Sequence, residues 1–347
     1  MRLAARGDNL MERLALRLNL APRPIIDLHW GMGFSRVLIT AARLGVLAEL
    51  AKGPATREEL AARCKLVPEP VGLLLNTLTD MGYLRLRAGG YEFRRHSRKW
   101  LDPAAPTSII NFLDSGGDFW DEWSQLEGVI RTGQRIDIHG RAPEDPYWRR
   151  YINGQLDSAR LNAPELSRRL KLPAGARSLL DVAGGHGWYS AELCRRHPGL
   201  HATVLDLPAS AAIGREIIAA AGMSDRVTYV EGDALTSDLG GPHDVVLCFN
   251  LIHHLTEEQA AGLIKRLHDA LRPGGILAVL SVFSNPPGKA MNHAGVALFF
   301  YMESGGGTHE AAELSRWFGD AGFNEPREVR VRSMAFYKLY VATRLPG

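Results

Sequence analysis

Several features that would each point to a class of protein are scarce in this sequence. Only three of its 347 residues are cysteines, Cys64, Cys194 and Cys248, and none form a C-x-x-C pair. A sparse, odd number of this kind suggests a reducing compartment without structural disulfides. Charged or polar residues interrupt every apolar run before it reaches the length of a membrane span. The N-terminal residues have no uninterrupted apolar segment, so we expect no signal peptide and a cytoplasmic protein.

An excess of charge of one sign is also missing. Lysine and arginine number 41 against 38 aspartates and glutamates, so the net charge is only +3. Composition therefore gives no argument for a nucleic-acid or membrane partner. Hydrophobic residues at 46% and charged residues at 23% are ordinary for a globular protein. The length predicts about two domains with enough chain for a large core.

The first third of the chain predicts helices followed by a hairpin. Residues 25–50 are apolar at helical spacing with few charges, which indicates a buried or dimer-facing helix pair. Thr56 and Glu59 predict a capping box at the next helix, and Pro68 opens another. Residues 83–93 alternate around a glycine turn, as in a β-hairpin. This is a winged-helix arrangement, but its second helix has no Lys or Arg, so we favour a dimerisation or lid module over DNA binding.

The middle of the chain, residues 106–172, is rich in aromatic side chains at helical spacing. Such residues usually form plain core, and the alternative is that some line a pocket for a flat acceptor. Pro173-Ala174-Gly175 then predicts a hinge into a last domain, residues 173–347. The aromatic residues are Phe112, Phe119, Trp120, Trp123, Tyr147, Trp148 and Tyr151.

The last half alternates between strand and helix patterns, which predicts an α/β fold with a parallel sheet. Two β-rich runs at 327–332 and 335–343 indicate a terminal antiparallel pair. The expected strands lie near 178–183, 202–206, 227–231, 244–249 and 276–281, and the expected helices near 188–197, 209–221, 256–272 and 310–321.

Residues 178–190 contain the clearest signal for a ligand. A short apolar run is followed by Gly184, Gly185 and Gly187 and then by a helical pattern. A glycine turn between strand and helix lets the backbone approach a ligand and points helix N–H groups at it. Asp206 ends the next strand, about 20 residues on, where a ribose diol would be held. The pattern predicts a nucleoside-cofactor site.

The glycine spacing alone is close to a dinucleotide fingerprint and would fit NAD. Two features favour a different nucleoside. Asp233 follows the third strand, where it could accept a hydrogen bond from an adenine amine. Trp188 and Tyr189 are bulky at the point where a pyrophosphate would need an open helix start.

Five motifs together resemble the small-molecule O-methyltransferase family that uses S-adenosylmethionine, which includes caffeic acid, acetylserotonin and bacterial polyketide O-methyltransferases. The resemblance covers nearly the whole chain, because that family also has an N-terminal winged-helix dimerisation region, here residues 1–105. It implies a class I methyltransferase fold, a Rossmann-like doubly wound sheet with an antiparallel C-terminal strand, and a homodimer. The motifs are Asp181-Val-Ala-Gly-Gly-His-Gly187, Asp206-Leu-Pro208, Glu231-Gly-Asp-Ala-Leu235, His253-His254-Leu255 and Arg272-Pro-Gly-Gly275.

The resemblance also implies roles for individual residues. The three loop glycines would pass the methionine part of the cofactor, Asp206 would hold the ribose, Leu207 would lie beside the adenine, and Asp233 would hold its amine. Asp181, Ala234 and Asn250 are the other cofactor residues we expect. No metal site is expected, because no cluster of ligands stands out. The expected acceptor residues are Trp120, Trp148, Asn292, His293, Phe299 and Met302.

His253, just past the fourth strand, matches the family's general base. A neutral imidazole is the usual group to remove a proton from a hydroxyl acceptor. The alternative is that His253 or His254 merely caps the helix that begins near Thr256.

The sequence differs from the family at the two positions expected to flank this histidine. Ser281 and Thr308 stand where the plant enzymes have two glutamates that flank the base. Because a carboxylate orients imidazole and stabilises its protonated form, we expect a weaker base here, or a substitute such as Glu303 or Glu310.

Three alternatives stay open at this point. The scaffold could methylate carbon or nitrogen, or belong to a relative that does not methylate. It could also be an NAD-dependent oxidoreductase, or a winged-helix regulator that only senses a ligand.

Overall fold

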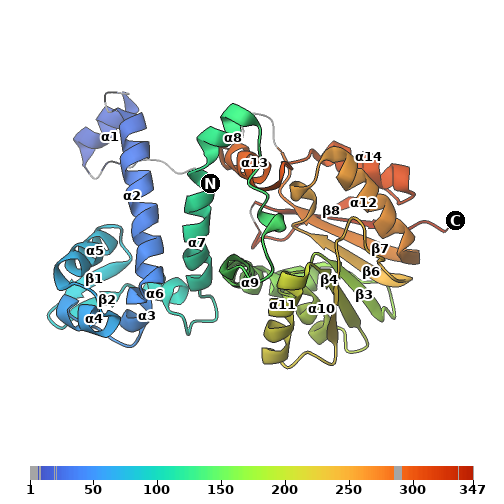
Figure 1. The fold of residues 1–347 in the computed structure, drawn as a ribbon, viewed down its shortest axis with the longest axis horizontal. Coiled ribbons are helices and arrows are strands. Elements are labelled where there is room, and N and C mark those ends of the chain that lie inside the picture. The colour runs from blue at the N-terminus through green and yellow to red at the C-terminus, as the bar shows by residue number, and fades with distance from the viewer. Residues whose placement is uncertain are drawn as a thin grey trace. The chain divides into compact units, whose positions relative to one another are not determined.

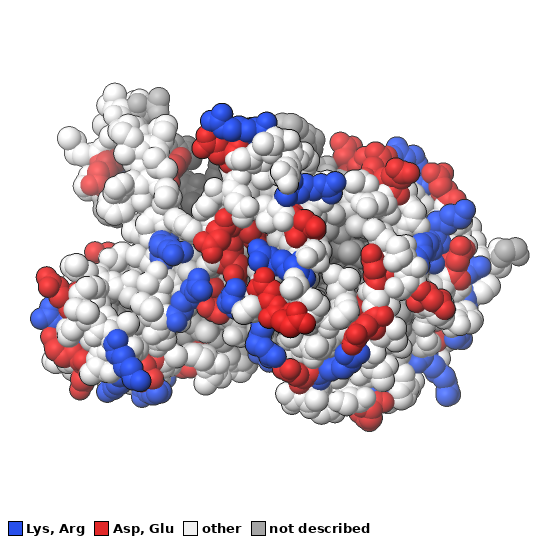
Figure 2. Space-filling model, viewed as in Figure 1, with Lys and Arg blue, Asp and Glu red and all other residues white. Residues whose placement is uncertain are grey.

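The computed structural model describes residues 7, 9–18, 20, 22–284, 291–334 and 336–346 (Figure 1). The chain forms two compact units, Met1–Gly117 and Asp118–Gly347. None of the described helices is long and apolar enough to cross a membrane. Lys and Arg side chains are interspersed with Asp and Glu on the face drawn in Figure 2.

The first unit contains the predicted helix, helix and hairpin. The capping box is confirmed, because the Glu59 N–H donates to Thr56 Oγ1 at 3.2 Å and the Thr56 N–H donates to a Glu59 carboxylate oxygen at 2.8 Å. The hairpin pairs Leu84 with Phe93, and a leucine-rich core lies beneath it. The elements are α1 Leu10–Arg17, α2 Arg23–Arg43, α3 Val46–Ala51, α4 Arg57–Cys64, α5 Pro68–Asp80, β1 Leu84–Arg87, β2 Gly90–Phe93 and α6 Arg95–Leu101.

The helix pair expected over residues 25–50 is present as the long α2 and the short α3. The first half of α2 is not buried within the chain, since Ile25, Leu28 and Trp30 are all exposed. Its apolar pattern therefore has no explanation in the unit's own core.

The second unit is built on a seven-stranded sheet in the order β5-β4-β3-β6-β7-β9-β8. The pairs from β5 to β7 are parallel, and β9 runs antiparallel to both β7 and β8, so the predicted sheet and its terminal pair are confirmed. The pair is shorter than predicted, and Ala335 lies outside the described residues. The strands are β3 Ser178–Val182, β4 His201–Asp206, β5 Val227–Glu231, β6 His243–Phe249, β7 Leu271–Ser281, β8 Arg327–Val329 and β9 Lys338–Thr343.

Helices cover both faces of this sheet, as a doubly wound fold requires. α9, α10 and α11 pack on one face, and α12 and α14 pack on the other (Figure 1). The four predicted helices are present as α10 Trp188–Arg196, α11 Pro208–Ala220, α12 Glu257–Asp269 and α14 Ala311–Ala321. The further elements are α7 Ile110–Trp123, α8 Leu126–Thr132, α9 Pro146–Arg169, α13 Met291–Ser304 and the 3₁₀ turns η1 Ile138–Gly140 and η2 Ile252–His254.

The strand order reverses between β3 and β6, because the chain builds outward through β4 and β5 and then crosses back. Ligands of open α/β sheets bind outside the carboxyl ends of the strands at such a switch point. The fold therefore predicts a ligand site at the carboxyl ends of β3, β4 and β6.

Candidate functional site

A cavity of about 480 Å³ lies at this edge of the sheet. Its volume is in the range of small-molecule sites. Eight of the nine predicted cofactor residues line it, which brings together groups at the carboxyl ends of four strands, β3 to β6. These eight are Asp181, Gly184, Gly185, Asp206, Leu207, Asp233, Ala234 and Asn250.

The backbone is strained where β3 and β6 end. Ala183 has φ +54° and Asn250 has φ +57°, in the left-handed region that residues other than glycine seldom adopt. Strain of this kind costs roughly 1–3 kcal/mol per residue and gathers at functional sites. The two residues flank the switch point and both line the cavity.

Two buried oxygens in the cavity wall lack partners. Oδ1 of Asp181 and Oδ1 of Asn250 make no hydrogen bond within the part of the chain that the structure describes. Buried polar atoms in native proteins are nearly always satisfied, so unpaired ones at a cavity indicate a site for donor groups of a ligand.

The glycine loop is shaped by close approaches. Gly185 has φ +50°, and a Cβ on Gly184 would lie 2.5 Å from the carboxyl carbon of Asp181. Gly187, with φ +64°, is not part of the cavity wall. It precedes α10 and packs on Tyr229, whose hydroxyl oxygen would lie 2.4 Å from an added Cβ. Gly184 and Gly185 therefore line the cavity, whereas Gly187 allows the close packing of the turn.

Two buried acids lie on either side of this loop. Asp206 accepts hydrogen bonds from the Gly185 N–H at 2.6 Å and the Leu207 N–H at 2.7 Å, and burial raises its pKa to about 6. Asp181 accepts from the Ser190 hydroxyl at 2.7 Å, and burial raises its pKa to about 7. Such acids are best satisfied by hydroxyl donors or by a positively charged ligand, which favours their ionised forms.

Helix α9 contributes polar groups that the sequence analysis missed. Gln155, Ser158 and Asn162 line the cavity together with Trp148 and Tyr151 of the same helix. All five recur at intervals of three or four residues, so they share one helical face. That spacing was visible in the sequence, but nothing in it showed that this face meets the cavity.

His186 in the glycine loop is a further missed residue. Its Nδ1 accepts a hydrogen bond from the Trp188 N–H at 3.0 Å, and burial lowers its pKa to about 4. A neutral imidazole with Nδ1 as acceptor carries its proton on Nε2, so His186 is a donor in the cavity wall.

These groups fit S-adenosylmethionine, the predicted cofactor. The orphaned oxygens and buried acids suit ribose hydroxyls and cationic groups, and the polar face of α9 with His186 suits an amino-acid end. Leu207 and Leu235 supply the apolar surface that an adenine ring needs, with the exposed Asp233 between them along the chain.

His253, the predicted base, lies on η2 and is 3% exposed. Its Nδ1 is 3.0 Å from the Ser281 hydroxyl oxygen, and its ring stacks on Phe300 with centroids 3.8 Å apart. The Ser281 hydroxyl also donates to the Val282 carbonyl oxygen at 3.4 Å. That bond leaves Ser281 to accept from Nδ1–H, so that Nε2 of His253 keeps its lone pair.

Burial lowers the pKa of His253 to about 3, with smaller effects from His309 and His139. The imidazole is therefore neutral at physiological pH. No carboxylate contributes to this shift, and Glu310 accepts the Glu313 N–H at the start of α14 instead. Thr308 is part of the segment whose Gly307 N–H donates to the His253 carbonyl oxygen at 2.9 Å.

Neither histidine of the pair caps α12. Thr256 does so in a capping box with Gln259. His254, whose Nδ1 is 3.2 Å from the Ser304 hydroxyl oxygen, lines the cavity, whereas His253 is not among the lining residues. The two imidazoles thus have different positions, and only the more distant one is held by Ser281.

The predicted acceptor residues fall in different places. Trp148 lines the cavity, and Met302 is fully buried. Phe299 stacks on Trp123 with centroids 5.3 Å apart and meets Phe119 edge-on at 5.6 Å, while Trp120 is half-buried on the same helix α7. The side chains of Asn292 and His293 lie outside the described residues. Among the described residues, no group of three His, Cys, Asp or Glu side chains could hold a metal ion.

Comparison with known proteins gives consistent matches along the chain. A family model described as an O-methyltransferase domain matches residues 131–324. A 3-hydroxy-5-methyl-1-naphthoate 3-O-methyltransferase of Streptomyces sahachiroi is 30% identical over 90% of this chain and 92% of its own length. The N,N-dimethyltransferase OxyT of Streptomyces rimosus is 26% identical, over 93% of this chain and 96% of its own. Human N-acetylserotonin methyltransferase, solved in complex with S-adenosylmethionine, shares the fold with a TM-score of 0.83 at 20% identity, covering 99% of this chain and 100% of that one.

Proposed function

Because this chain belongs to the O-methyltransferase family, we propose that it transfers a methyl group from S-adenosylmethionine to a hydroxyl group of a small aromatic acceptor. The family model and the relatives confirm the three predictions made from the sequence for family, fold class and cofactor. The observation that carries the proposal is the cavity at the switch point, whose wall combines buried acids, orphaned oxygens and a glycine loop.

The cofactor supplies an electrophilic methyl group on a positively charged sulfur. Transfer of such a group needs alignment of the acceptor more than new covalent chemistry. In this proposal Asp206 holds the ribose, Asp233 holds the adenine amine, and the backbone at Gly184 and Gly185 lies along the methionine part. Asp181, Leu207, Ala234 and Asn250 complete that wall, and Gly187 keeps the turn in place.

His253 removes the proton of the acceptor hydroxyl at Nε2, while Ser281 holds Nδ1. A serine hydroxyl carries no charge, so it stabilises the imidazolium less than a carboxylate would. With a pKa near 3, His253 is a weak base, which suits an acidic hydroxyl such as a phenol better than an alcohol. The weakness of this base therefore favours an aromatic hydroxyl as the acceptor.

The acceptor is a flat aromatic or polyketide-like molecule. The aromatic group of Phe299, Trp123 and Phe119 supports this, and Trp120, Trp148 and Met302, with Asn292 and His293, remain the predicted acceptor residues. The naphthoate acted on by the Streptomyces sahachiroi relative is of this class. Transfer to nitrogen is the second candidate, favoured by the similarity to OxyT.

We also propose that the protein works as a cytoplasmic homodimer through its winged-helix unit. Ten exposed apolar side chains lie between Leu10 and Phe34, in α1, in the first half of α2 and between these helices, and such a patch marks an interaction surface. Light scattering of the purified chain should give twice the chain mass, and Leu28→Glu with Trp30→Glu should give a monomer. These side chains are Leu10, Met11, Leu14, Leu18, Leu20, Ile25, Leu28, Trp30, Met32 and Phe34. The predicted division into residues 1–105, 106–172 and 173–347 belongs to this proposal.

Calorimetric titration with S-adenosylhomocysteine and with NAD tests the cofactor directly. Binding of the first and not the second is expected. A screen of phenols, naphthols and polyketides with S-adenosylmethionine then tests the reaction, with mass spectrometry and NMR to identify the methylated atom.

A further inference from the structure

A set of buried polar side chains lies close to the acceptor aromatics and has no part in the proposed transfer. It consists of the buried Glu122 on α7, Tyr147 on α9 and Glu303 on α13, together with Arg141, whose side chain is 32% exposed, and we call it the buried polar cluster. Glu122 and Tyr147 are 1% exposed and Glu303 is 2% exposed. Residues with these polar groups are seldom buried unless something satisfies them.

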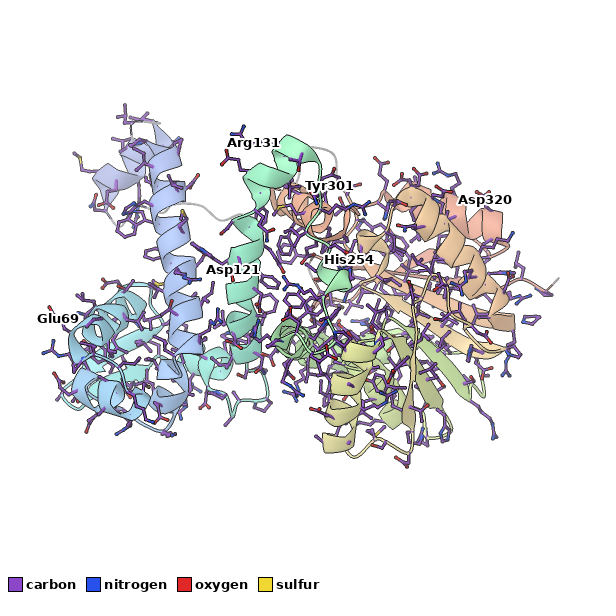
Figure 3. The ribbon with its side chains drawn as sticks, in the orientation of Figure 1. Glu69, Asp121, Arg131, His254, Tyr301 and Asp320 are labelled. Atoms are coloured by element: carbon purple, nitrogen blue, oxygen red, sulfur yellow. The ribbon has the colours of Figure 1, made fainter. Side chains whose placement is uncertain are left out.

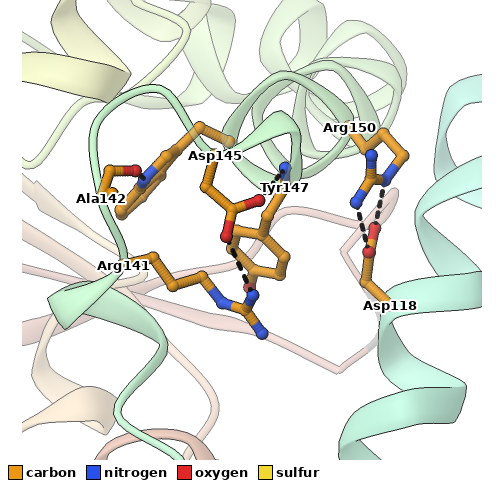
Figure 4. Close-up of polar contacts among 7 residues, drawn as sticks. Asp118, Arg141, Ala142, Asp145, Tyr147 and Arg150 are labelled. Carbon is orange, nitrogen blue, oxygen red and sulfur yellow. Dashed lines mark hydrogen bonds and ion pairs between the residues drawn. The ribbon is translucent and has the colours of Figure 1, made fainter.

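Four polar atoms of the cluster have no partner among the described residues. Both carboxylate oxygens of Glu122, the Tyr147 hydroxyl and Nε of Arg141 are buried without a hydrogen-bond partner among the residues described. Arg141 pairs through Nη1 with Asp145 at 3.2 Å, and its guanidinium lies 4.3 Å from the centre of the Tyr147 ring (Figure 4). The remaining atoms therefore offer acceptors and a hydroxyl to a group that is not part of this chain.

The cluster adjoins both the cavity and the proposed base. Tyr147 stacks on Tyr151, with centroids 5.5 Å apart and planes at 13°, and Tyr151 lines the cavity. On α13, Glu303 lies one turn after Phe300, the residue that stacks on His253. Tyr147 thus connects the cluster to the cavity wall, and α13 connects it to the ring that stacks on His253.

The ionisation of the two acids fits a role in binding donor groups. Burial raises the pKa of Glu303 to about 9, with a further rise from Glu122, so Glu303 is protonated at neutral pH. Burial raises the pKa of Glu122 to about 7, while Arg141 and the Tyr147 hydroxyl lower it; this hydroxyl is close enough to act on Glu122 as a donor but makes no hydrogen bond of normal geometry with it. Ionised Glu122 accepts hydrogen bonds only, and its two oxygens have free acceptor capacity.

We propose that the buried polar cluster selects the acceptor, and that Glu122 and Tyr147 hold a second hydrogen-bond donor on it, a hydroxyl or an amine. This donor is on the side of the aromatic ring system away from the hydroxyl that is methylated. The inference rests on the proposed function, since it concerns the acceptor of the same site. A site built to hydrogen-bond such a group rejects analogues that lack it, because its own buried polar atoms are then left unpaired.

The test measures the affinity of matched probes for the full chain saturated with S-adenosylhomocysteine. The probes are 2-naphthol, the 2,3-, 2,6- and 2,7-dihydroxynaphthalenes, and the amino-2-naphthols with nitrogen at the same positions. At least one hydroxyl or amino probe should bind about tenfold more tightly than 2-naphthol, a typical gain for one buried hydrogen bond. The hydroxyl and amino series show which donor the cluster takes.

Two variants assign the preference to the cluster. Glu122→Leu and Tyr147→Phe should each reduce it to within about twofold, with affinity for 2-naphthol unchanged or higher. Glu122→Leu should also keep or raise the melting temperature, because it removes an unpaired buried carboxyl group. Asp121→Asn, which changes the exposed neighbour of Glu122 on the same helix (Figure 3), should leave the preference intact.

The inference is overturned if no donor-bearing probe binds better than 2-naphthol, whether all bind equally or none binds. It is also overturned if the preference survives in Glu122→Leu, or if that variant lowers the melting temperature and weakens all probes alike. Failure to bind S-adenosylhomocysteine would instead contradict the proposed function, which separates the two results.

Discussion

Nδ1 of His253 lies 3.0 Å from the hydroxyl oxygen of Ser281, so a serine occupies the place of a carboxylate beside the proposed base. The sequence predicted that a carboxylate would be missing there. The structure adds that the serine holds the ring, that Phe300 stacks on its face, and that the imidazole stays neutral.

Replacing the imidazole tests the assignment of the base. His253→Ala should lower kcat by about 10²- to 10⁴-fold, the usual contribution of a general base, with unchanged affinity for S-adenosylhomocysteine. His254→Ala is the matched control, because His254 lines the cavity but is not held by Ser281. A larger loss of kcat in His254→Ala than in His253→Ala would show that His254 removes the proton instead.

A charged partner at position 281 should change the pH profile of kcat. With a pKa near 3, His253 is already deprotonated above pH 5 and gives no acid limb there at saturating substrates. Ser281→Asp favours the imidazolium and raises the pKa of His253, so kcat should fall on the acid side of a new, higher midpoint. Ser281→Ala should lower kcat without creating such a limb. A profile for Ser281→Asp that matches the wild type would show that Ser281 does not act on the base.

The ribose role of Asp206 predicts a loss of cofactor affinity. Asp206→Asn replaces an acceptor of two backbone N–H bonds with a group that accepts through one oxygen only. Affinity for S-adenosylhomocysteine should fall by roughly 10- to 100-fold, as for a lost hydrogen bond to a charged group. Glu231→Gln, at an exposed ion pair with Arg215, should bind as the wild type does. Equal affinity of the two variants for S-adenosylhomocysteine would contradict the proposal that Asp206 holds the ribose.

The raised pKa of Asp181 predicts how stability without the cofactor depends on pH. The folded state binds the proton more tightly than the unfolded state, whose Asp has a pKa near 4, so this contribution is complete below about pH 4. It is lost as pH rises through the folded pKa of about 7. Between pH 4 and 7, Asp181→Asn should therefore gain stability relative to the wild type, on the order of 1.4 kcal/mol for each rise of one in pH.

The difference between variant and wild type is the relevant quantity in those denaturant titrations. His186 and His253 have lowered pKa values, so they make both proteins less stable as pH falls below about 6.5, and they cancel in the comparison. A difference that does not vary with pH would contradict the raised pKa of Asp181.

Much of the second unit followed from the sequence because its signals are local. The central strands are short apolar runs, and Asp206 at the end of β4 and Asn250 just after β6 mark ends that meet at one sheet edge. The capping box at Thr56 depends on residues three apart, which is why it was predictable. The motifs and the strand pattern therefore both placed the cofactor site at the carboxyl ends of the parallel strands.

What the sequence could not show depends on distant segments that meet only in the fold. Gln155 and Asn162 face the cavity because α9 packs across α10 and α11, and no local pattern states this. Glu122 and Tyr147 come together from two helices, so neither residue signalled an unsatisfied cluster. The different surroundings of His253 and His254 likewise depend on how η2 packs against α13.

The most direct test of the central claim is the position of the new methyl group after incubation with S-adenosylmethionine carrying a ¹³C-labelled methyl. We predict release of S-adenosylhomocysteine with an aromatic acceptor, and a ¹³C signal in the O-methyl region of the product. A label found on nitrogen or carbon, or an enzyme that binds S-adenosylhomocysteine and methylates no phenol or naphthol, would contradict the account.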